Sequence, residues 1–269
     1  MNKIDLESTK SQRTGFVGLF ETTLRKFKIL TYLISMIPIY LVACLVLATA
    51  LVPAIYTFKS IQNLTHLSGE LVQNIGIALS LAAGYFIYGT TLMFVAPLVN
   101  FILRAKLKAW RGPYHSAESV KWFIHNGLTY LVRYTFLEFV TPSPLSLLFY
   151  RMMGMKMGSG VVINTTWISD PSLIELGDKV TLGGSVTIVA HYGQGGLLVI
   201  APVRIGNNCT VGLKSSIMGG VIMGDGAKLL PHSVVLPKTV IPPGETWGGV
   251  PAVKIDLLKV IKNASTPAA

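Results

Sequence analysis

A bulky aliphatic residue recurs at every sixth position through the C-terminal part of the chain. These residues are Ile205, Val211, Ile217, Met223, Leu229, Val235 and Ile241. Small or β-branched residues stand two places before each of them, at 203, 209, 215, 221, 227, 233 and 239. A period of six fits neither an amphipathic helix nor a hairpin strand. It predicts a hexapeptide parallel β-helix with three short strands per coil, whose aliphatic residues fill a continuous apolar core.

The same period recurs upstream at Leu176, Leu182 and Ile188, and farther up Met157 and Ile163 fit it as well. Ile188 stands seventeen residues before Ile205 rather than eighteen, so the register is broken in the segment AHYGQGGLLVIAP. A loop that leaves a regular solenoid at one point is where function usually resides. We therefore expect functional residues at this interruption.

Two long stretches without a charged residue precede the repeats, at positions 29–58 and 71–103. A bilayer core requires only about 20 apolar residues in a helix, so each stretch is long enough to span once. We predict two transmembrane helices joined by a short loop at 59–70, with Pro38, Pro53 and Pro97 kinking or ending them near the interfaces. Two buried core helices are a poor alternative, because uncharged runs of this length are rare in water-soluble folds.

Residues 112–153 are expected to form amphipathic linker helices. Apolar residues at helical spacing within 117–140, among them Val120, Ile124 and Leu128, predict a helix that the Thr-Pro-Ser-Pro stretch at 141–144 ends. Periodicity alone allows two roles. The helices either lie in the membrane interface and dock the next domain, or are ordinary packing helices.

The composition favours a membrane component. Of the 269 residues, 51% are hydrophobic and only 13% are charged, while the formal net charge is +11. Six basic residues precede the first apolar stretch and four follow the second at 104–111, whereas the connecting loop carries only Lys59. The positive-inside rule then places both termini and the repeat domain on the cytoplasmic side of the inner membrane. Charge that flanks apolar stretches argues against nucleic acid as the partner.

The remaining sequence signals are negative. Cys44 and Cys209 have a spacing that suggests neither a disulfide framework nor a zinc site, so no metal is expected. No cleavable signal peptide is apparent, because the first apolar stretch starts late and is too long.

The repeat region also resembles a known family. The segments GDKVTLGGSVTIVAH, VRIGNNCTVG and IPPGETWGGVPA resemble the hexapeptide-repeat acyltransferases with a left-handed β-helix, over roughly 150–256. The segment MGMKMGSGVVINTTWISDPSLIELGD is closer still to the membrane-embedded C-terminal region of polylysine-synthetase-type nonribosomal peptide synthetases. Those proteins also combine transmembrane helices with such a β-helix. The resemblance implies a left-handed coil and acyl transfer from a thioester.

The resemblance implies three catalytic residues. In the family, a histidine at a coil edge just before an extruded loop is the general base, and His191 occupies that place. An imidazole titrates near neutrality and can take the proton of an attacking hydroxyl or amine. Asp170 aligns near this histidine and either orients its ring, binds the acceptor or caps a turn. Ser185 stands where some relatives carry a residue that contacts the acceptor.

His232 follows an inward aliphatic residue by three, as His191 does, so both histidines are expected at equivalent corners. It either lines the same groove in a neighbouring subunit or is simply exposed.

The resemblance also implies a donor site and an assembly. Relatives lay acetyl-CoA or another acyl-CoA along the coil edges near the C-terminal end, and they are homotrimers with the active site between adjacent prisms. The matching positions are Leu213, Lys214, Lys238, Trp247, Gly248 and Lys254. Trp247 either stacks on an adenine or covers the last coil, and the lysines either meet phosphates or are solvated. The loop HYGQGGLLVIAP lacks the acidic residues of the synthetase-type proteins, and its apolar LLVI is a candidate contact for lipid or an acyl chain.

These expectations divide the chain into an N-terminal segment with a transmembrane hairpin (1–111), linker helices (112–153), a β-helix acyltransferase domain (154–256) and a tail (257–269). The predicted function is a membrane-bound acyltransferase that moves an acyl group such as acetyl from a cytoplasmic thioester to a hydroxyl or amine of a lipid-linked or membrane-associated acceptor. One alternative is a non-catalytic trimeric membrane scaffold. The other is a γ-carbonic-anhydrase-like metalloenzyme, which needs three zinc-binding histidines where the β-helix offers only His191 and His232.

Overall fold

The computed structural model describes residues 10–11 and 13–256, which fall into two compact units. One unit, the helical unit, contains the described residues up to Ala105 together with Phe123–Phe139. The other, the solenoid unit, contains Lys106–Trp122 and residues 140–256. The predicted tail at 257–269 lies outside the described residues.

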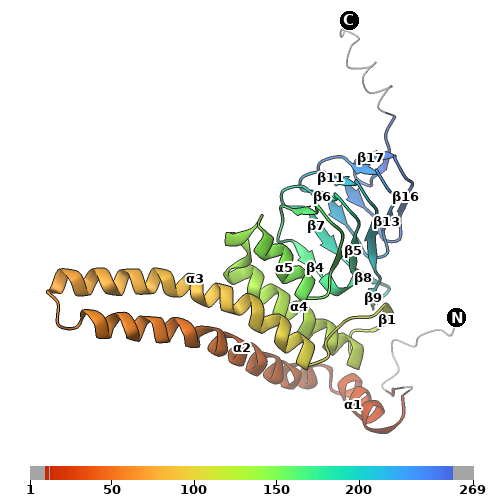
Figure 1. Ribbon diagram of the computed structural model, residues 1–269. Helices are drawn as coiled ribbons and strands as arrows, with labels where there is room; N and C mark the ends of the chain where they lie inside the picture. Colours follow the sequence, from red (N-terminus) through yellow and green to blue (C-terminus); the bar gives the residue numbers. More distant parts are fainter. Residues whose placement is uncertain (1–9, 12, 257–269) are drawn as a thin grey trace, which may run out of the picture. The chain divides into compact units, whose positions relative to one another are not determined.

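Two long helices dominate the helical unit. They are α2 (Lys28–Thr65) and α3 (Glu70–Ile102), which run side by side as a hairpin (Figure 1). Both predicted apolar stretches are helical, but α2 continues through most of the expected loop and only residues 66–69 connect the two helices. Pro38, Pro53 and Pro97 lie inside the helices and do not end them. A proline removes one backbone hydrogen bond, and apolar helices of this length retain the others.

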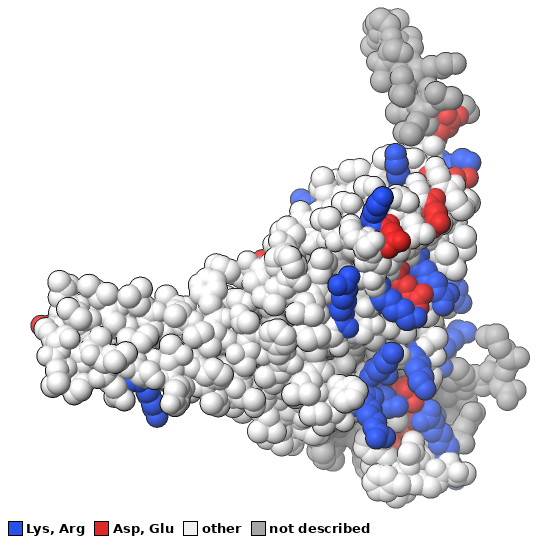
Figure 2. Space-filling model, in the orientation of Figure 1, with Lys and Arg blue, Asp and Glu red and all other residues white. Residues whose placement is uncertain are grey.

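Met36–Thr65 and Glu70–Ile102 are long and apolar enough to cross a membrane, by length and composition. Only 17% and 28% of their most apolar windows are buried, whereas helices in the core of a water-soluble protein are mostly buried. On the face shown in Figure 2, the hairpin surface is almost free of Lys, Arg, Asp and Glu.

A short helix that the sequence did not predict precedes the hairpin. Helix α1 (Gly15–Lys26) exposes Phe16 and Leu19 and buries Glu21. The Glu21 carboxylate accepts a hydrogen bond from Ser11 Oγ at 2.6 Å and pairs with Arg13 at 3.7 Å. These contacts fix the start of the helix through its only acidic residue.

The predicted linker contains three helical segments. They are α4 (Ala117–Thr135), the 3₁₀ helix η1 (Leu137–Val140) and α5 (Pro144–Met152). Ser143 caps α5, because its Oγ accepts from the backbone N–H of Leu145 and of Ser146. The α4 residues of the helical unit are buried on more than the expected apolar face. His125 and Thr129 are buried as well, and Nδ1 of His125 lies 2.9 Å from Oδ1 of Asn100.

The solenoid unit contains three parallel sheets, which we call faces 1, 2 and 3. Face 1 contains β2 (Lys156–Met157), β5 (Ile174–Leu176), β10 (Val203–Ile205), β13 (Ile222–Met223) and β16 (Val240–Ile241). Face 2 contains β3 (Val162–Ile163), β6 (Thr181–Leu182), β11 (Thr210–Val211), β14 (Lys228–Leu229) and β17 (Thr246–Gly248), followed by β18 (Val253–Lys254), which pairs antiparallel with β17. Face 3 contains β4 (Ile168–Ser169), β7 (Thr187–Val189), β12 (Ser216–Ile217) and β15 (Val234–Val235). The chain visits the faces in turn, so the predicted three strands per coil are confirmed, and the left hand of the coil stays a prediction.

The residues predicted to point inward form the core. All seven aliphatic residues of the regular series are buried, and so are their partners two places earlier except Thr239, which is half-exposed. Val211 pairs with Leu229, eighteen residues later, but on its other side it pairs with Leu182, twenty-nine residues earlier. The difference is the predicted interruption, which leaves the coil between β7 and β10.

The interruption is a β-hairpin and not an irregular loop. Strands β8 (His191–Gln194) and β9 (Leu197–Ile200) pair antiparallel, and β9 also pairs antiparallel with β1 (Trp110–Pro113). All four residues of the LLVI segment are therefore in a central strand and buried. The expectation that this segment touches lipid or an acyl chain is wrong, because β1, β8 and the coil already cover it.

The corners between the faces are named by the faces that they join. Edge 1–2 carries a ladder of side-chain acceptors, in which Asp178 Oδ1 accepts from the Ser159 N–H at 2.7 Å and Asn207 Oδ1 accepts from the Asp178 N–H at 2.8 Å. Asp225 Oδ1 accepts from the Asn207 N–H at 2.7 Å. The bonds from the Ser159 N–H and hydroxyl hold the pKa of Asp178 below its usual range. The ladder satisfies corner N–H groups that no strand can bind.

Candidate active site

His191 and Asp170 meet at edge 3–1, where the hairpin leaves the coil. Nδ1 of His191 and Oδ2 of Asp170 are 2.5 Å apart. The Asp170 side chain is fully buried, whereas that of His191 is 21% exposed. Asp170 follows β4 with a φ of 58°, a left-handed conformation that aspartate adopts more readily than most residues. Because the carboxylate holds Nδ1, Nε2 is the ring nitrogen left to accept a proton.

Two further residues confine the imidazole. The indole of Trp122 in α4 meets it edge to face, with ring centroids 4.9 Å apart. In the next coil, a Cβ on Gly219 would lie only 3.0 Å from the backbone nitrogen of His191, a tight contact that glycine avoids. Neither residue was predicted from the sequence. Trp122 stands off the apolar stripe of its helix, and no spacing in the sequence connects it to His191.

Only some of the predicted site residues lie at edge 3–1. Asp170, His191 and Lys238 all lie between a face 3 strand and a face 1 strand, and His191 is the first residue of β8. The Lys238 N–H donates to the carbonyl of Gly219, which places this lysine one coil above the glycine that contacts His191. One exposed cation therefore stands on the same edge as the His191–Asp170 pair.

Edge 2–3 carries a second group. Ser185, Lys214 and His232 occupy successive turns between face 2 and face 3, linked by backbone bonds from Lys214 N to Gly184 O and from His232 N to Leu213 O. Ser185 and His191 are thus at opposite ends of β7 and do not meet within one chain. The two solenoid histidines stand on different edges, so the expectation of equivalent corners holds only for their spacing from the core residue.

The predicted donor residues near the C-terminal end form one connected cluster. Glu245 accepts from Trp247 Nε1 at 2.8 Å and from Lys254 Nζ at 2.6 Å. The Lys254 ammonium, and then the indole N–H, lower the pKa of Glu245. Gly248 is buried against Leu230, a residue of edge 2–3. A Cβ added at Gly248 would lie only 3.0 Å from the Leu230 side chain. Trp247, Gly248 and Lys254 therefore lie together, next to edge 2–3.

Within residues 10–11 and 13–256, no three His, Cys, Asp or Glu side chains are grouped as a metal site requires. Cys209 is buried inside the coil, and burial raises the pKa of its thiol.

The comparison with known sequences returns a synthetase. A scan against protein-family models finds no match. The chain is 25% identical over 185 residues to the Delta-poly-L-ornithine synthetase of Acinetobacter baumannii (strain AB307-0294). That match covers 66% of this chain but only 13% of the synthetase, so the chain spans a small part of the length of this relative.

The comparison with solved structures returns acetyltransferases. A hexapeptide-repeat-containing acetyltransferase from Vibrio cholerae O1 biovar eltor, complexed with acetyl coenzyme A, aligns with a TM-score of 0.45 and 19% identity over 57% of this chain and 96% of that one. A maltose O-acetyltransferase from Clostridium difficile 630 aligns with a TM-score of 0.41 and 19% identity over 56% and 94%. A serine acetyltransferase from Neisseria gonorrhoeae, in complex with serine, gives 0.36 and 17% over 81% and 74%. Both comparisons return the kinds of protein that the sequence resembles.

Proposed function

We propose that the chain is a membrane-bound acyltransferase of the hexapeptide-repeat type, with a left-handed coil. It moves an acyl group, such as acetyl, from acyl-CoA to a hydroxyl or amine of a lipid-linked or membrane-associated acceptor. One observation carries the proposal: a half-buried imidazole hydrogen-bonded to a fully buried carboxylate, at the point where the β8–β9 hairpin leaves the solenoid.

The chemistry follows from the two side chains. Nε2 of His191 takes the proton of the acceptor hydroxyl or amine while the acceptor oxygen or nitrogen bonds to the thioester carbonyl carbon. The buried carboxylate of Asp170 stabilises the imidazolium that forms. When the tetrahedral intermediate collapses, the carbon–sulfur bond breaks and the imidazolium returns its proton to the thiolate. The products are an ester or amide and the free thiol of coenzyme A.

The donor site is proposed to be completed by a second copy of the chain. His191 and Asp170 stand on edge 3–1, whereas Lys214 and the Trp247–Lys254 cluster lie at or next to edge 2–3. A closed homotrimer brings edge 3–1 of one copy against edge 2–3 of the next, since rotation repeats the same contact between unlike surfaces. The basic residues then meet the phosphates of coenzyme A beside the imidazole.

The membrane part of the proposal is supported by the hairpin α2–α3. Its apolar windows are mostly unburied by the chain, so a hydrocarbon phase is the environment that suits them. The basic residues that flank both helices favour termini in the cytoplasm.

The test compares two histidine variants of the purified full chain in lipid nanodiscs, with acetyl-CoA as donor and a membrane lipid extract as acceptor. His191→Ala is expected to lower the rate of thiol release about 10²- to 10⁴-fold, the usual contribution of a general base. His66→Ala, an exposed histidine in the connection between α2 and α3, serves as the matched control and keeps the full rate. Equal rates for wild type and His191→Ala would overturn the general-base assignment. A wild-type chain that never releases thiol would favour the alternative function, a non-catalytic trimeric membrane scaffold.

A further inference from the structure

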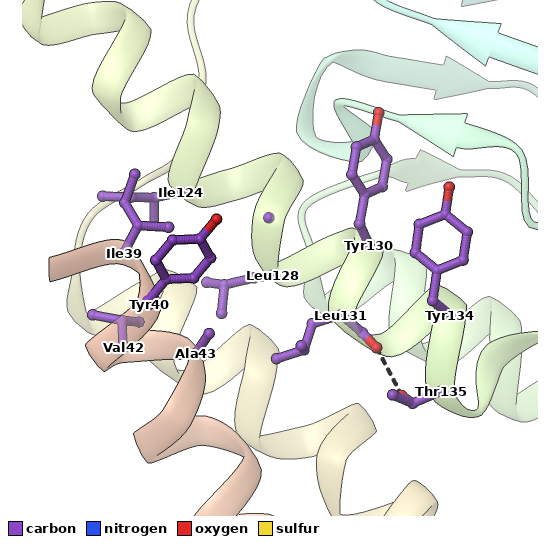
Figure 3. A pocket seen from close by; sticks show the side chains of 11 residues that line it. Ile39, Tyr40, Val42, Ala43, Ile124, Leu128, Tyr130, Leu131, Tyr134 and Thr135 are labelled. Atoms are coloured by element: carbon purple, nitrogen blue, oxygen red, sulfur yellow. Dashed lines mark hydrogen bonds between the residues drawn. The ribbon is translucent and has the colours of Figure 1, made fainter. Parts of the chain in front are cut away.

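A groove of about 320 Å³ lies in the helical unit between α2 and α4 (Figure 3). Its walls come from residues 39–43 of α2 and 124–135 of α4. They are almost wholly apolar, with Val42, Ala43, Leu128 and Leu131 among them. The one hydrogen bond drawn in Figure 3 runs from Thr135 Oγ1 to the Leu131 carbonyl at 2.7 Å, so that hydroxyl is bound within its own helix. The volume is at the lower end of ligand pockets, about 300–1,000 Å³.

A glycine keeps the groove open. Gly127 lines it from the middle of α4, and a Cβ at this position would meet nothing within 4 Å. Its φ is not positive, so the backbone does not require glycine there. A glycine inside a helix is less stable than an alanine at the same position. Neither backbone geometry nor a close neighbour explains Gly127, and its structural effect is empty space in the groove.

Three tyrosines stand along the groove. In Figure 3 the hydroxyl groups of Tyr40, Tyr130 and Tyr134 point the same way. The Arg133 guanidinium lies 5.0 Å from the Tyr134 ring and 5.9 Å from the Tyr130 ring, which adds positive charge beside the tyrosines. Tyrosine combines an apolar ring with a polar tip, so it suits the boundary between a hydrocarbon chain and a polar head group.

The walls point to the occupant. One wall is α2, which is long and apolar enough to cross a membrane and whose Tyr40 and Leu41 are exposed. The other is α4, the helix that also carries Trp122, the residue against His191. We propose that this groove binds the hydrocarbon chain of the acyl acceptor, so that the acceptor is a lipid-like alcohol or amine. The inference rests on the proposed acyl transfer and names its substrate class.

The experiment measures chain-length preference. The full chain in nanodiscs is assayed with acetyl-CoA as donor and with hexadecanol and butanol, or hexadecylamine and butylamine, as acceptors. The quantity measured is the ratio of kcat/KM for the long acceptor to kcat/KM for the short one. Gly127→Leu fills the groove and displaces two or more methylene groups, each worth about fourfold in binding. The ratio is expected to fall at least about tenfold in this variant. Gly127→Ala, which adds one carbon, is expected to lower it less.

Gly69→Leu is the matched control, because a Cβ at Gly69 also meets nothing within 4 Å but the residue lies between α2 and α3, outside the groove. Its long-to-short ratio stays at the wild-type value. A diazirine-bearing hexadecanol adds a direct readout: wild type is expected to form photo-adducts at residues 124–135, and Gly127→Leu to lose them.

Acetylation with the same ratio in wild type and Gly127→Leu would overturn the groove assignment and leave the acyltransferase proposal standing. Photo-adducts in the groove without acetylation of any of the four acceptors would overturn the acceptor assignment and count against the acyltransferase itself.

Discussion

The imidazole of His191 is held by groups of different chemistry from distant parts of the chain. A buried carboxylate binds Nδ1, an indole edge covers the ring, and a glycine in the next coil allows the backbone to approach. Of these three groups, only the carboxylate carries a charge that can stabilise a protonated ring. A substitution that removes this charge and keeps the shape of the side chain therefore tests the role of the carboxylate apart from that of the packing residues.

Asp170→Asn makes that change. The amide fills the same space but does not stabilise the imidazolium, so kcat is expected to fall about 10²-fold or more, while KM for acetyl-CoA stays near the wild-type value. Steady-state kinetics across pH check this, because a purely structural role would leave the shape of the pH–rate profile unchanged. Asp225→Asn removes a carboxylate from edge 1–2 and is expected to keep the wild-type kcat. A wild-type kcat in Asp170→Asn would refute the assignment.

The solenoid is stabilised differently along its three edges. Edge 1–2 uses Asp178, Asn207 and Asp225 as acceptors for corner N–H groups. Non-glycine residues in the left-handed conformation occur on all three edges, among them Lys179, Lys214 and Lys238. The left-handed turn is therefore common to the edges, and the acceptor ladder is what distinguishes edge 1–2.

Asp178 gives this ladder a predictable pH dependence. Its folded pKa lies below the usual value of about 3.9, so its contribution to stability is complete above that value and is lost as pH falls through the folded pKa. Asp178→Asn keeps an acceptor at the corner, as Asn207 does, and removes the titration. The difference in melting temperature between wild type and Asp178→Asn should therefore narrow from about pH 6 to about pH 3. Circular dichroism melts at the two pH values measure it, and an equal gap at both would contradict the prediction.

At the same scale, the sequence predicted the coil and missed the strand that braces its interruption. The six-residue period predicts which side chains point inward because each coil repeats the same local geometry, and the aliphatic positions from Ile205 to Ile241 are all buried. Strand β1 has the sequence Trp-Arg-Gly-Pro, which alternates weakly and includes two poor strand formers. It is a strand only because β9 pairs with it, and the paired residues, 84 to 90 positions later in the chain, leave no local signal.

The sequence also did not predict which edge of the solenoid each candidate site residue occupies. The spacing of His191 and His232 from a core residue predicts a corner, but it does not say which of the three corners. Across the interruption the coil spacing changes from eighteen residues to twenty-nine, so counting by six loses the face. Asp170 and His191 were expected to be neighbours from the family resemblance, and the structure places them in contact, whereas the proposed role of Ser185 stays a prediction.

For the whole molecule, the proposed function makes assembly part of the chemistry. Edge 3–1 carries the proposed base, and the residues proposed for the donor lie at or beside edge 2–3. In a closed ring of identical chains, each site takes one edge from each neighbour, and edge 1–2 is left out of the contact.

Mixed assemblies test this arrangement. His191→Ala and Trp247→Ala chains are each expected to be weakly active alone, because every site lacks one residue. When the two are refolded or co-expressed together at equal amounts, random association gives about a quarter of the sites an intact base and an intact donor surface, so activity returns to that fraction of wild type. Thiol release from acetyl-CoA measures the recovery. No recovery in a mixture that forms trimers would place the whole site within one chain.

In the proposed assembly, a lone chain has the proposed base on one edge and the proposed donor surface on another, so it holds no complete site. Chains in the proposed membrane location meet by diffusion in the plane of the lipid. The proposal therefore implies that the rate per chain rises with the number of copies per unit of membrane area and falls when the same quantity is spread over more lipid.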